Sequence, residues 1–256
     1  MFNKIAELVR QNIEFAICTI VSIDGSSPGK SGFRMIVFPD SSIEGTVGGG
    51  NLEKLIIKKA VENIKKNITS FEEFTLSDVN MTCGGKTSVY IEVIKRKSRI
   101  VIAGAGHIGK ELLRIVNETR DFDIIAFDNR KDRVESLSNE YKVEYLEDFI
   151  GLENCIEEGD YVVVLTHGHA FDMQALLYVS KGKKTSYVGC IGSKSKVAKL
   201  KSDLLEHGVS QNFINTIFTP IGVKLGGDSP FEIAISILAE IIAVKNTGKS
   251  VCPMKD

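Results

Sequence analysis

The chain has 256 residues, of which 43% are hydrophobic and 25% are charged, so its composition is that of an ordinary globular protein and its length favours two domains. Its 32 basic and 33 acidic residues leave a net charge of -1, which excludes a general electrostatic attraction to nucleic acid or to an anionic membrane. Apolar runs stay well short of the roughly 20 residues needed to cross a bilayer, and the first residues lack the basic-then-apolar order of a signal peptide, so a cytoplasmic protein is expected.

The first part of the chain is predicted to form a small mixed α/β domain. The expected elements are helices over residues 2–11 and 51–66 and strands over residues 15–21, 34–38, 43–47, 71–76 and 87–94. A basic stretch over residues 95–99 follows, and the composition changes there to a regular alternation of strands and helices. We therefore place the domain boundary after residue 97, which gives domains of residues 1–97 and 98–256.

The second domain alternates short apolar runs with segments of helical length. The runs cover residues 100–103, 124–127, 143–145, 161–165 and 186–189. Apolar runs of this kind suit strands that are buried on both faces, as in a parallel sheet covered by helices. A last helix is expected from Pro230 to about Lys245, because Ser229 can cap it and proline is favoured at the first helical position. The sequence thus predicts an α/β fold with a Rossmann-type parallel sheet in this domain.

A glycine-rich turn follows the first of these runs. Gly104, Gly106 and Gly109, with His107 between them, match the G-x-G-x-x-G pattern that joins a strand to a helix in dinucleotide-binding domains. Glycines let backbone amides approach a pyrophosphate at the positive end of the helix. Asp128 ends the next run, where a carboxylate usually holds ribose hydroxyls. The structural alternative is a tight strand-to-helix turn that binds no nucleotide.

Several unusual strand ends are expected to meet at one edge of the sheet, because ligands bind at the carboxyl ends of parallel strands. They are Asp128-Asn129-Arg130 and the segments 165–169, 189–194 and 220–222. Gly192, Ser193 and Lys194 open a helix and suit a second anion site. Their alternative interpretation is a capped helix with a solvated lysine face.

Two histidines and an aspartate follow the strand at residues 161–165. His167 and His169 lie two residues apart on an extended strand end, so their side chains should point to opposite sides and a shared metal is not expected. We expect one histidine to hydrogen-bond the ligand and the neighbourhood of Asp172 to cap the following helix. His107, in the glycine turn, is expected to pack or to donate a hydrogen bond and not to catalyse.

The first domain has a glycine run of its own. Gly48, Gly49 and Gly50, with Glu53 shortly after, join a strand to a helix and expose more backbone than a turn needs, which indicates another cradle for an anion. Glycine-rich links are common, so a structural turn is the alternative.

The chain has five cysteines and no C-x-x-C pair, which argues against a disulfide framework and against a structural zinc site. Cys18, Cys155 and Cys190 lie in apolar segments and are expected to be buried. Cys83, followed by Gly84 and Gly85, is expected to be accessible and surrounded by amides that favour the thiolate. An inert structural thiol is the alternative for Cys83.

Taken together, these motifs resemble the XdhC/CoxI family, the accessory proteins of xanthine dehydrogenase and related molybdenum hydroxylases. The motifs of the first domain are Ser26-Ser27-Pro28, Gly45-Thr46-Val47-Gly48-Gly49-Gly50 with Glu53, and Cys83-Gly84-Gly85. Those of the second domain are Gly104-Ala105-Gly106-His107, Asp128-Asn129-Arg130, Thr166-His167-Gly168-His169 with Asp172, residues 187–194, Pro220-Ile221-Gly222 and residues 230–234.

The resemblance implies a protein that binds molybdenum cofactor (molybdopterin), shields it while a cysteine desulfurase supplies its terminal sulfur ligand, and delivers it to the hydroxylase apoenzyme. It implies a homodimeric cofactor chaperone without catalytic residues, in which Cys83 contacts the metal or relays sulfur. A competing hypothesis is an NAD(P)-dependent oxidoreductase that uses the glycine fingerprint and Asp128. A third is a Rossmann domain that serves only in dimerisation or partner docking.

Overall fold

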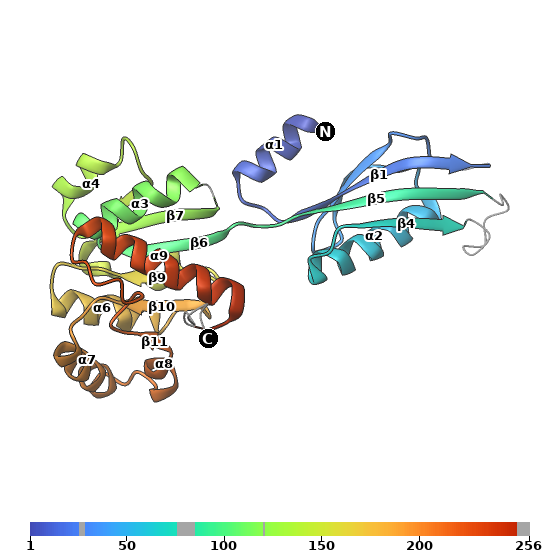
Figure 1. The fold of residues 1–256 in the computed structure, drawn as a ribbon. Helices are drawn as coiled ribbons and strands as arrows, with labels where there is room; N and C mark the ends of the chain where they lie inside the picture. The colour runs from blue at the N-terminus through green and yellow to red at the C-terminus, as the bar shows by residue number, and fades with distance from the viewer. Residues whose placement is uncertain (26–28, 76–84, 120, 250–256) are drawn as a thin grey trace. The chain divides into compact units, whose positions relative to one another are not determined.

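A computed structural model of the chain describes residues 1–25, 29–75, 85–119 and 121–249 (Figure 1). It divides after Lys97 into two compact units, Met1–Lys97 and Ser98–Asp256, each with its own sheet. None of the helices in these ranges is both long enough and apolar enough to cross a membrane.

The first unit is built on a five-stranded antiparallel sheet with the strand order β3-β2-β1-β5-β4. Its elements are α1 (Phe2–Arg10), β1 (Phe15–Asp24), β2 (Arg34–Val37), β3 (Ile43–Gly45), α2 (Gly50–Lys66), β4 (Ser70–Thr75) and β5 (Lys86–Ile94).

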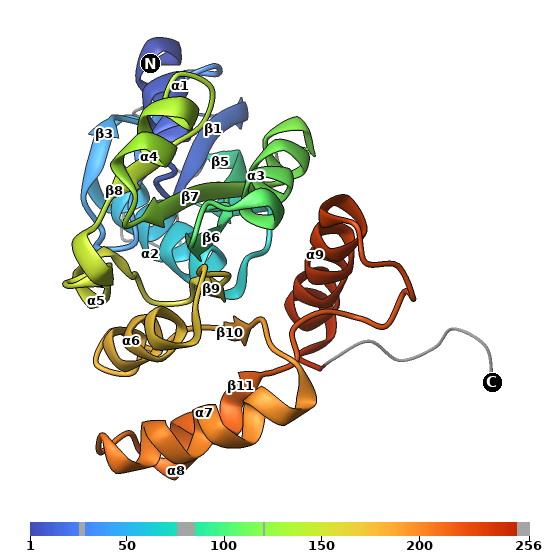
Figure 2. The ribbon, with the colours of Figure 1, turned by 90° about the vertical axis from the view of Figure 1, so that its left-hand side faces the viewer.

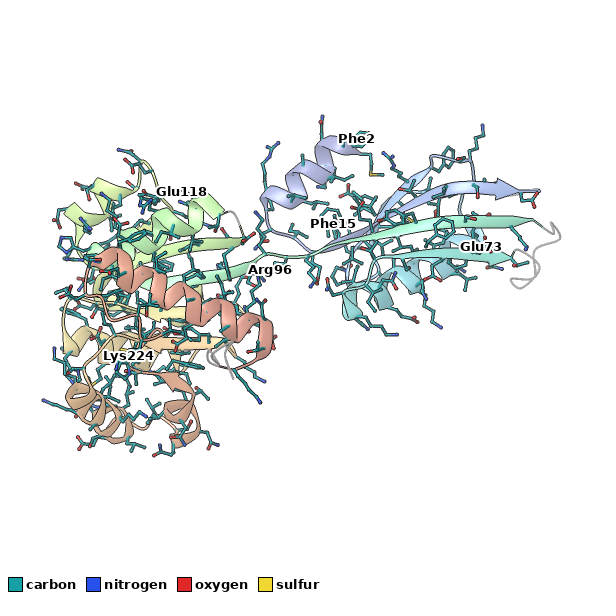
Figure 3. The ribbon with its side chains drawn as sticks, viewed as in Figure 1. Phe2, Phe15, Glu73, Arg96, Glu118 and Lys224 are labelled. Carbon is teal, nitrogen blue, oxygen red and sulfur yellow. The ribbon has the colours of Figure 1, made fainter. Side chains whose placement is uncertain are left out.

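Alternate side chains of β1 lie on opposite faces of this sheet, because successive side chains of a strand point in opposite directions. Ala16, Cys18 and Ile20 pack in a buried cluster with the apolar side of α2. On the other face Phe15, which is fully buried and labelled in Figure 3, packs with Leu8 of α1. Helices therefore cover both faces of the sheet at its β1 strand.

The second unit is built on a six-stranded, entirely parallel sheet with the strand order β11-β10-β9-β6-β7-β8. Its strands are β6 (Ser98–Ala103), β7 (Phe122–Asp128), β8 (Val143–Tyr145), β9 (Tyr161–Val164), β10 (Tyr187–Cys190) and β11 (Ile217–Phe218). Its helices are α3 (His107–Thr119), α4 (Lys131–Leu137), the short 3-10 helix η2 (Glu147–Phe149), α5 (Leu152–Cys155), α6 (His169–Val179), α7 (Lys194–Glu206), α8 (Gln211–Thr216) and α9 (Pro230–Thr247). From β6, the next two strands, β7 and β8, are added on one side. The chain then returns, and β9, β10 and β11 are added on the other side of β6, which is the Rossmann order. The predicted fold class is confirmed.

Helices cover both faces of the parallel sheet (Figure 2). Ile100 and Ile102 of β6 belong to a buried cluster that includes residues of α3 and α9. Val101 and Ala103 of the same strand belong to the opposite cluster, which includes residues of α6 and α7. Burial on both faces explains why the central strands are continuous apolar runs in the sequence.

Three details differ from the sequence-based expectations or go beyond them. Cys155, which was expected to be buried, is only half-buried because it lies at the end of the one-turn helix α5. The strand β11 was not predicted, since two residues are too short to show a periodic pattern. The cap of α9 is stronger than expected, because Ser229 and Glu232 form a complete capping box in front of Pro230.

Candidate functional site

The loops that follow four neighbouring strands meet at the carboxyl edge of the parallel sheet. The amide of Gly104 donates to the carbonyl of Phe127 at 2.8 Å, the amide of Leu165 to Ala103 at 2.7 Å, and the amide of Ile191 to Val164 at 3.0 Å. The sequence after β6, β7, β9 and β10 is thereby held side by side. Since the direction of strand addition reverses between β6 and β9, this edge is where an open α/β sheet forms its ligand crevice.

The glycine turn after β6 has the shape that the sequence predicted. Gly104 has a φ of +108°, and a Cβ added there would lie 2.3 Å from the carbonyl oxygen of Leu165. A Cβ on Gly109 would lie 2.3 Å from the carbonyl oxygen of Gly104, so this glycine lets α3 pack against the turn. A Cβ on Gly106 would meet no atom within 4 Å. The backbone at Gly106 is therefore open to a ligand, while Gly104 and Gly109 are required by packing.

Asp128, at the end of β7, is 1% exposed and faces this turn. Its carboxylate accepts hydrogen bonds from the amide of Ala105 at 2.8 Å and from the amide of Arg130 at 3.0 Å. The guanidinium of Arg130 donates to both carboxylate oxygens, from Nε at 2.8 Å and from Nη2 at 2.7 Å. Burial by itself would raise the pKa of Asp128, but these hydrogen bonds outweigh it and lower the pKa. The expected contact with ribose hydroxyls is not what this arrangement offers, because the carboxylate braces the glycine turn.

A second arginine completes the bracing of the turn. Arg133, on α4, donates from Nε to the carbonyl oxygen of Ala105 at 2.7 Å, so both backbone polar groups of Ala105 are fixed by side chains. Arg133 was not predicted from the sequence. The available signal was its position three residues after Arg130 at the start of a helix, a spacing that places two side chains on one face.

Asp172 lies in the first turn of α6 and is 8% exposed. Its Oδ1 accepts from the amide of Thr166 at 3.2 Å and from the hydroxyl of Thr166 at 2.5 Å. It therefore closes the loop that precedes the helix, whereas the cap position is Gly168 and has no side-chain cap bond. The expectation that this neighbourhood caps the helix is corrected accordingly. Burial raises the pKa of Asp172, against the smaller lowering effect of the bonds from Thr166.

The three histidines predicted for the site have different surroundings. His169 Nε2 lies 3.3 Å from Asp203 Oδ2 of α7, which links α6 to α7. His167 is exposed, and its ring centroid lies 4.6 Å from that of Phe171. His107 begins α3 and is exposed, so it does not pack in the turn as expected. A contact between one histidine and a ligand stays a prediction.

A small cavity lies beside the loop after β10. Gly192 precedes Ser193, the N-cap residue of α7, and the side chain of Lys194 is outside the described part of the structure. A cavity of about 10 Å³, enough for about one water molecule, lies beside this loop and is lined by His169, Asp172, Ile191, Gly192, Lys196, Val197, Leu200 and Thr219. Among the described residues no hydrogen-bond partner is found for the buried Thr219 Oγ1.

The glycine run of the first unit differs from the expected open cradle. Gly48, Gly49 and Gly50 have φ values of 118°, 76° and 72°, which explains the need for glycine. However, Glu53 Oε2 accepts hydrogen bonds from the amide of Val47 at 3.1 Å and from the amide of Gly49 at 3.3 Å. It also accepts from the hydroxyl of Thr46 at 2.5 Å, and the amide of Gly48 donates to that hydroxyl at 3.1 Å. The chain's own carboxylate thus takes the place expected for an external anion.

The remaining predicted positions of the first unit are mostly outside the described residues. They include Cys83, proposed as the metal-contacting thiol, with Gly84 and the Ser26-Ser27-Pro28 motif. Gly85 is described and is buried directly before β5.

Comparisons with known proteins agree across both units. A family model described as the XdhC Rossmann domain matches residues 100–241, and another described as the XdhC and CoxI family matches residues 8–75. The "Uncharacterized protein YqeB" of Escherichia coli (strain K12) is 30% identical over 264 aligned positions, which cover 100% of this chain and 48% of that protein. A protein of Bacillus subtilis (strain 168), named as a probable xanthine dehydrogenase subunit, is 27% identical over 167 positions, which cover 62% of this chain and 46% of that protein.

The chain spans about half the length of these two relatives. A crystal structure of a xanthine dehydrogenase from Bacillus halodurans matches with a TM-score of 0.53 and 19% identity, over 98% of this chain and 97% of that chain. At this identity the match shows a shared fold.

Proposed function

Because the chain belongs to the XdhC and CoxI family, we propose that it is an accessory protein of a molybdenum hydroxylase of the xanthine dehydrogenase type. The proposal is supported by the similarity to a relative from Bacillus subtilis whose name refers to xanthine dehydrogenase. In this role the chain binds molybdenum cofactor, supports its sulfuration by a cysteine desulfurase and passes it to the apoenzyme.

The observation that carries the proposal is the open glycine turn of the second unit, with two arginines beside it. Gly106 leaves space for a ligand to approach the backbone. Arg133 binds the carbonyl of Ala105 directly, and Arg130 binds Asp128, which accepts from the amide of Ala105. Molybdopterin carries a phosphate, and guanidinium groups together with backbone amides are suited to bind one. When bound, the cofactor would supply the molybdenum chemistry, while these residues orient its phosphate.

We propose Cys83 as the thiol that acts in sulfuration, and the described cysteines are poorly suited to that role. Cys18 and Cys190 are buried, and burial raises the pKa of Cys18 to about 12 and raises that of Cys190 as well. Burial also raises the pKa of the half-buried Cys155. Because the thiolate is the reactive form, these three thiols are poor sulfur carriers at neutral pH. Cys83, in its Cys-Gly-Gly motif, is the candidate we propose.

The direct test is to purify the chain from cells that make molybdenum cofactor and to measure released pterin by fluorescence and mass spectrometry. Stoichiometric pterin is expected, and the matched control is the same protein from cells unable to make molybdopterin. Pterin no higher than in that control would contradict the proposal. Light scattering on the same preparation tests the homodimer that the family resemblance implies.

A sulfur role for Cys83 has its own test. Cys83→Ala should leave the thermal transition unchanged and abolish maturation of the client hydroxylase, whereas Cys155→Ala should leave maturation intact. Normal maturation with Cys83→Ala would remove this residue from the sulfuration step.

The Rossmann strand order and the glycine turn also favour a second candidate, an NAD(P)-dependent oxidoreductase. Titration of NADH and NADPH fluorescence separates the two functions. Micromolar binding accompanied by hydride transfer to an acceptor would favour the oxidoreductase, since a cofactor chaperone requires no hydride transfer.

A further inference from the structure

All acceptor sites of the Asp128 carboxylate, the group expected to bind ribose hydroxyls, are occupied by hydrogen-bond donors of the chain itself. In Rossmann domains that bind NAD, an acidic residue at the end of the second strand accepts hydrogen bonds from ribose hydroxyls. At this position Asp128 Oδ1 accepts from the amide and Nε of Arg130, and Oδ2 accepts from the amide of Ala105 and from Nη2 of Arg130. An ionised carboxylate has about four acceptor sites. Four donors and 1% exposure therefore leave Asp128 without capacity for a ligand hydroxyl.

The accessible charged groups next to this carboxylate are the cations Arg130, Lys131 and Arg133 and one carboxylate, Asp132. The side chain of Arg130 is 36% exposed although it is held in a two-bond fork by Asp128. Arg133 uses Nε to bind the carbonyl of Ala105, and its terminal nitrogens have no acceptor within the described ranges. Lys131 lies between the two arginines in sequence and has its Nζ 5.2 Å from the centroid of the Tyr145 ring. Asp128 and Asp132 offset two of these three positive charges, so the start of α4 keeps an excess of one positive charge, with guanidinium groups as its hydrogen-bond donors.

We infer that this crevice selects ligands that place a phosphate monoester beside Arg130 and Arg133 over ligands that place an unsubstituted ribose diol there. A phosphate monoester carries nearly two negative charges at neutral pH and accepts hydrogen bonds through its terminal oxygens. Planar guanidinium groups match that geometry. A diol would need an acceptor, and the nearest carboxylate is already saturated. The inference deepens the proposed function and rests on it in one respect, that the ligand enters this crevice.

Two ligands supply this chemistry, and both are used as probes on the full-length protein. The first pair is NADP+ and NAD+, which differ only in the phosphate monoester that NADP+ carries on the 2′-oxygen of its adenosine ribose. The second pair is oxidised molybdopterin, taken before and after removal of its terminal phosphate by a phosphatase. Binding is measured by isothermal titration calorimetry. We expect the member with the monoester to bind at least about tenfold more tightly in one or both pairs, as loss of charge-assisted hydrogen bonds would require.

Substitution of the second arginine localises the effect. Arg133→Gln should remove most of the preference for the monoester. The ratio of the two dissociation constants within a ligand pair should fall about tenfold. The matched control is Arg114→Gln, which also removes one positive charge but lies on α3 with Glu111 and Glu118 as its partners. The control should leave the preference unchanged. Arg133→Lys keeps the charge without the planar fork and should give an intermediate preference.

Substitution of the first arginine should invert the selection. Arg130→Gln removes the two side-chain donors that Arg130 gives to Asp128, so affinity for NAD+ should rise while affinity for NADP+ falls. If Arg130→Gln does not fold, the Arg133 series decides the matter by itself.

The outcomes separate this inference from the proposed function. A preference of less than about twofold in both ligand pairs, or no binding of any of the four probes, overturns the inference even when pterin copurifies with the protein. A preference equally lost in Arg133→Gln and Arg114→Gln overturns the assignment to this site, because it would reflect net charge. Absence of copurified pterin with a clear nucleotide preference supports the inference and contradicts the proposed function.

Discussion

The two glycine turns of this protein look alike in sequence and differ in what they offer to a ligand. Each joins a strand to a helix, and each uses glycine at positive φ. In the first unit, Glu53 occupies the amides of Val47 and Gly49. In the second unit, Asp128 holds the amide of Ala105 but leaves the backbone at Gly106 open. A glycine pattern therefore predicts the shape of a turn, whereas neighbouring carboxylates decide which of its amides remain available.

The largest expected effect is at Gly104. Gly104→Ala combines a left-handed φ with a Cβ 2.3 Å from the Leu165 carbonyl oxygen. We expect unfolding to become easier by at least about 3 kcal/mol, measured by urea denaturation. The matched variant is Gly106→Ala, where the Cβ enters open space, and it should change stability by less than about 1 kcal/mol while weakening ligand binding. Similar stabilities for the two variants would remove the distinction between a packing glycine and a ligand-facing one.

A smaller effect is expected in the glycine turn of the first unit. Glu53→Ala leaves the amides of Val47 and Gly49 without their acceptor, and Val47 is fully buried. A loss of about 1–3 kcal/mol is expected, and the control Glu62→Ala, on the exposed side of α2, should stay within about 0.5 kcal/mol of the original protein.

The same variant tests whether the turn becomes an anion site. Phosphate at millimolar concentration should raise the melting temperature of Glu53→Ala more than that of the original protein, because the freed amides can then bind an external anion. Equal phosphate stabilisation of both proteins would show that the turn has a structural role alone.

Two buried carboxyls of the second unit should respond to pH in opposite directions. The folded-state pKa of Asp128 is lowered, so its stabilisation is present above the ordinary pKa of about 4 and is lost as the pH falls below it. The folded-state pKa of Asp172 is raised, mainly by burial, so this group reduces stability as the pH rises above about 4. The two variants Asp128→Asn and Asp172→Asn are compared with the original protein by denaturation between pH 3 and 7. As the pH rises, Asp128→Asn should become less stable relative to the original protein, and Asp172→Asn should become more stable relative to it. Parallel curves would contradict the assigned environments.

The smallest effect is expected where the crevice meets α7. The His169 and Asp203 side chains, 29% and 25% exposed, are 3.3 Å apart. Partly solvated polar contacts of this kind contribute little, so Asp203→Asn should cost less than about 1 kcal/mol in urea denaturation. A loss comparable to that of Glu53→Ala would mean that this link fixes the crevice more strongly than its exposure indicates.

Local features of this protein could be predicted from its amino-acid sequence alone. Apolar runs indicated the strands β6 to β10, the Ser229-Pro230 cap indicated the start of α9, and the glycine spacing indicated the shape of the turn after β6. These signals are readable because strand burial, helix capping and positive φ each depend on a few neighbouring residues. The exceptions were short elements, such as the two-residue strand β11.

Which polar groups meet was determined only by the folded arrangement. Ala105 and Asp128 are 23 positions apart, and Ala105 and Arg133 are 28 positions apart, yet they form one hydrogen-bonded unit. The same motif residues would be compatible with an Asp128 carboxylate that is free to accept hydrogen bonds from ribose hydroxyls. They would be equally compatible with a carboxylate that is hydrogen-bonded to Arg130. Which of these occurs depends on how the start of α4 packs beside the turn, and no local sequence pattern specifies that packing.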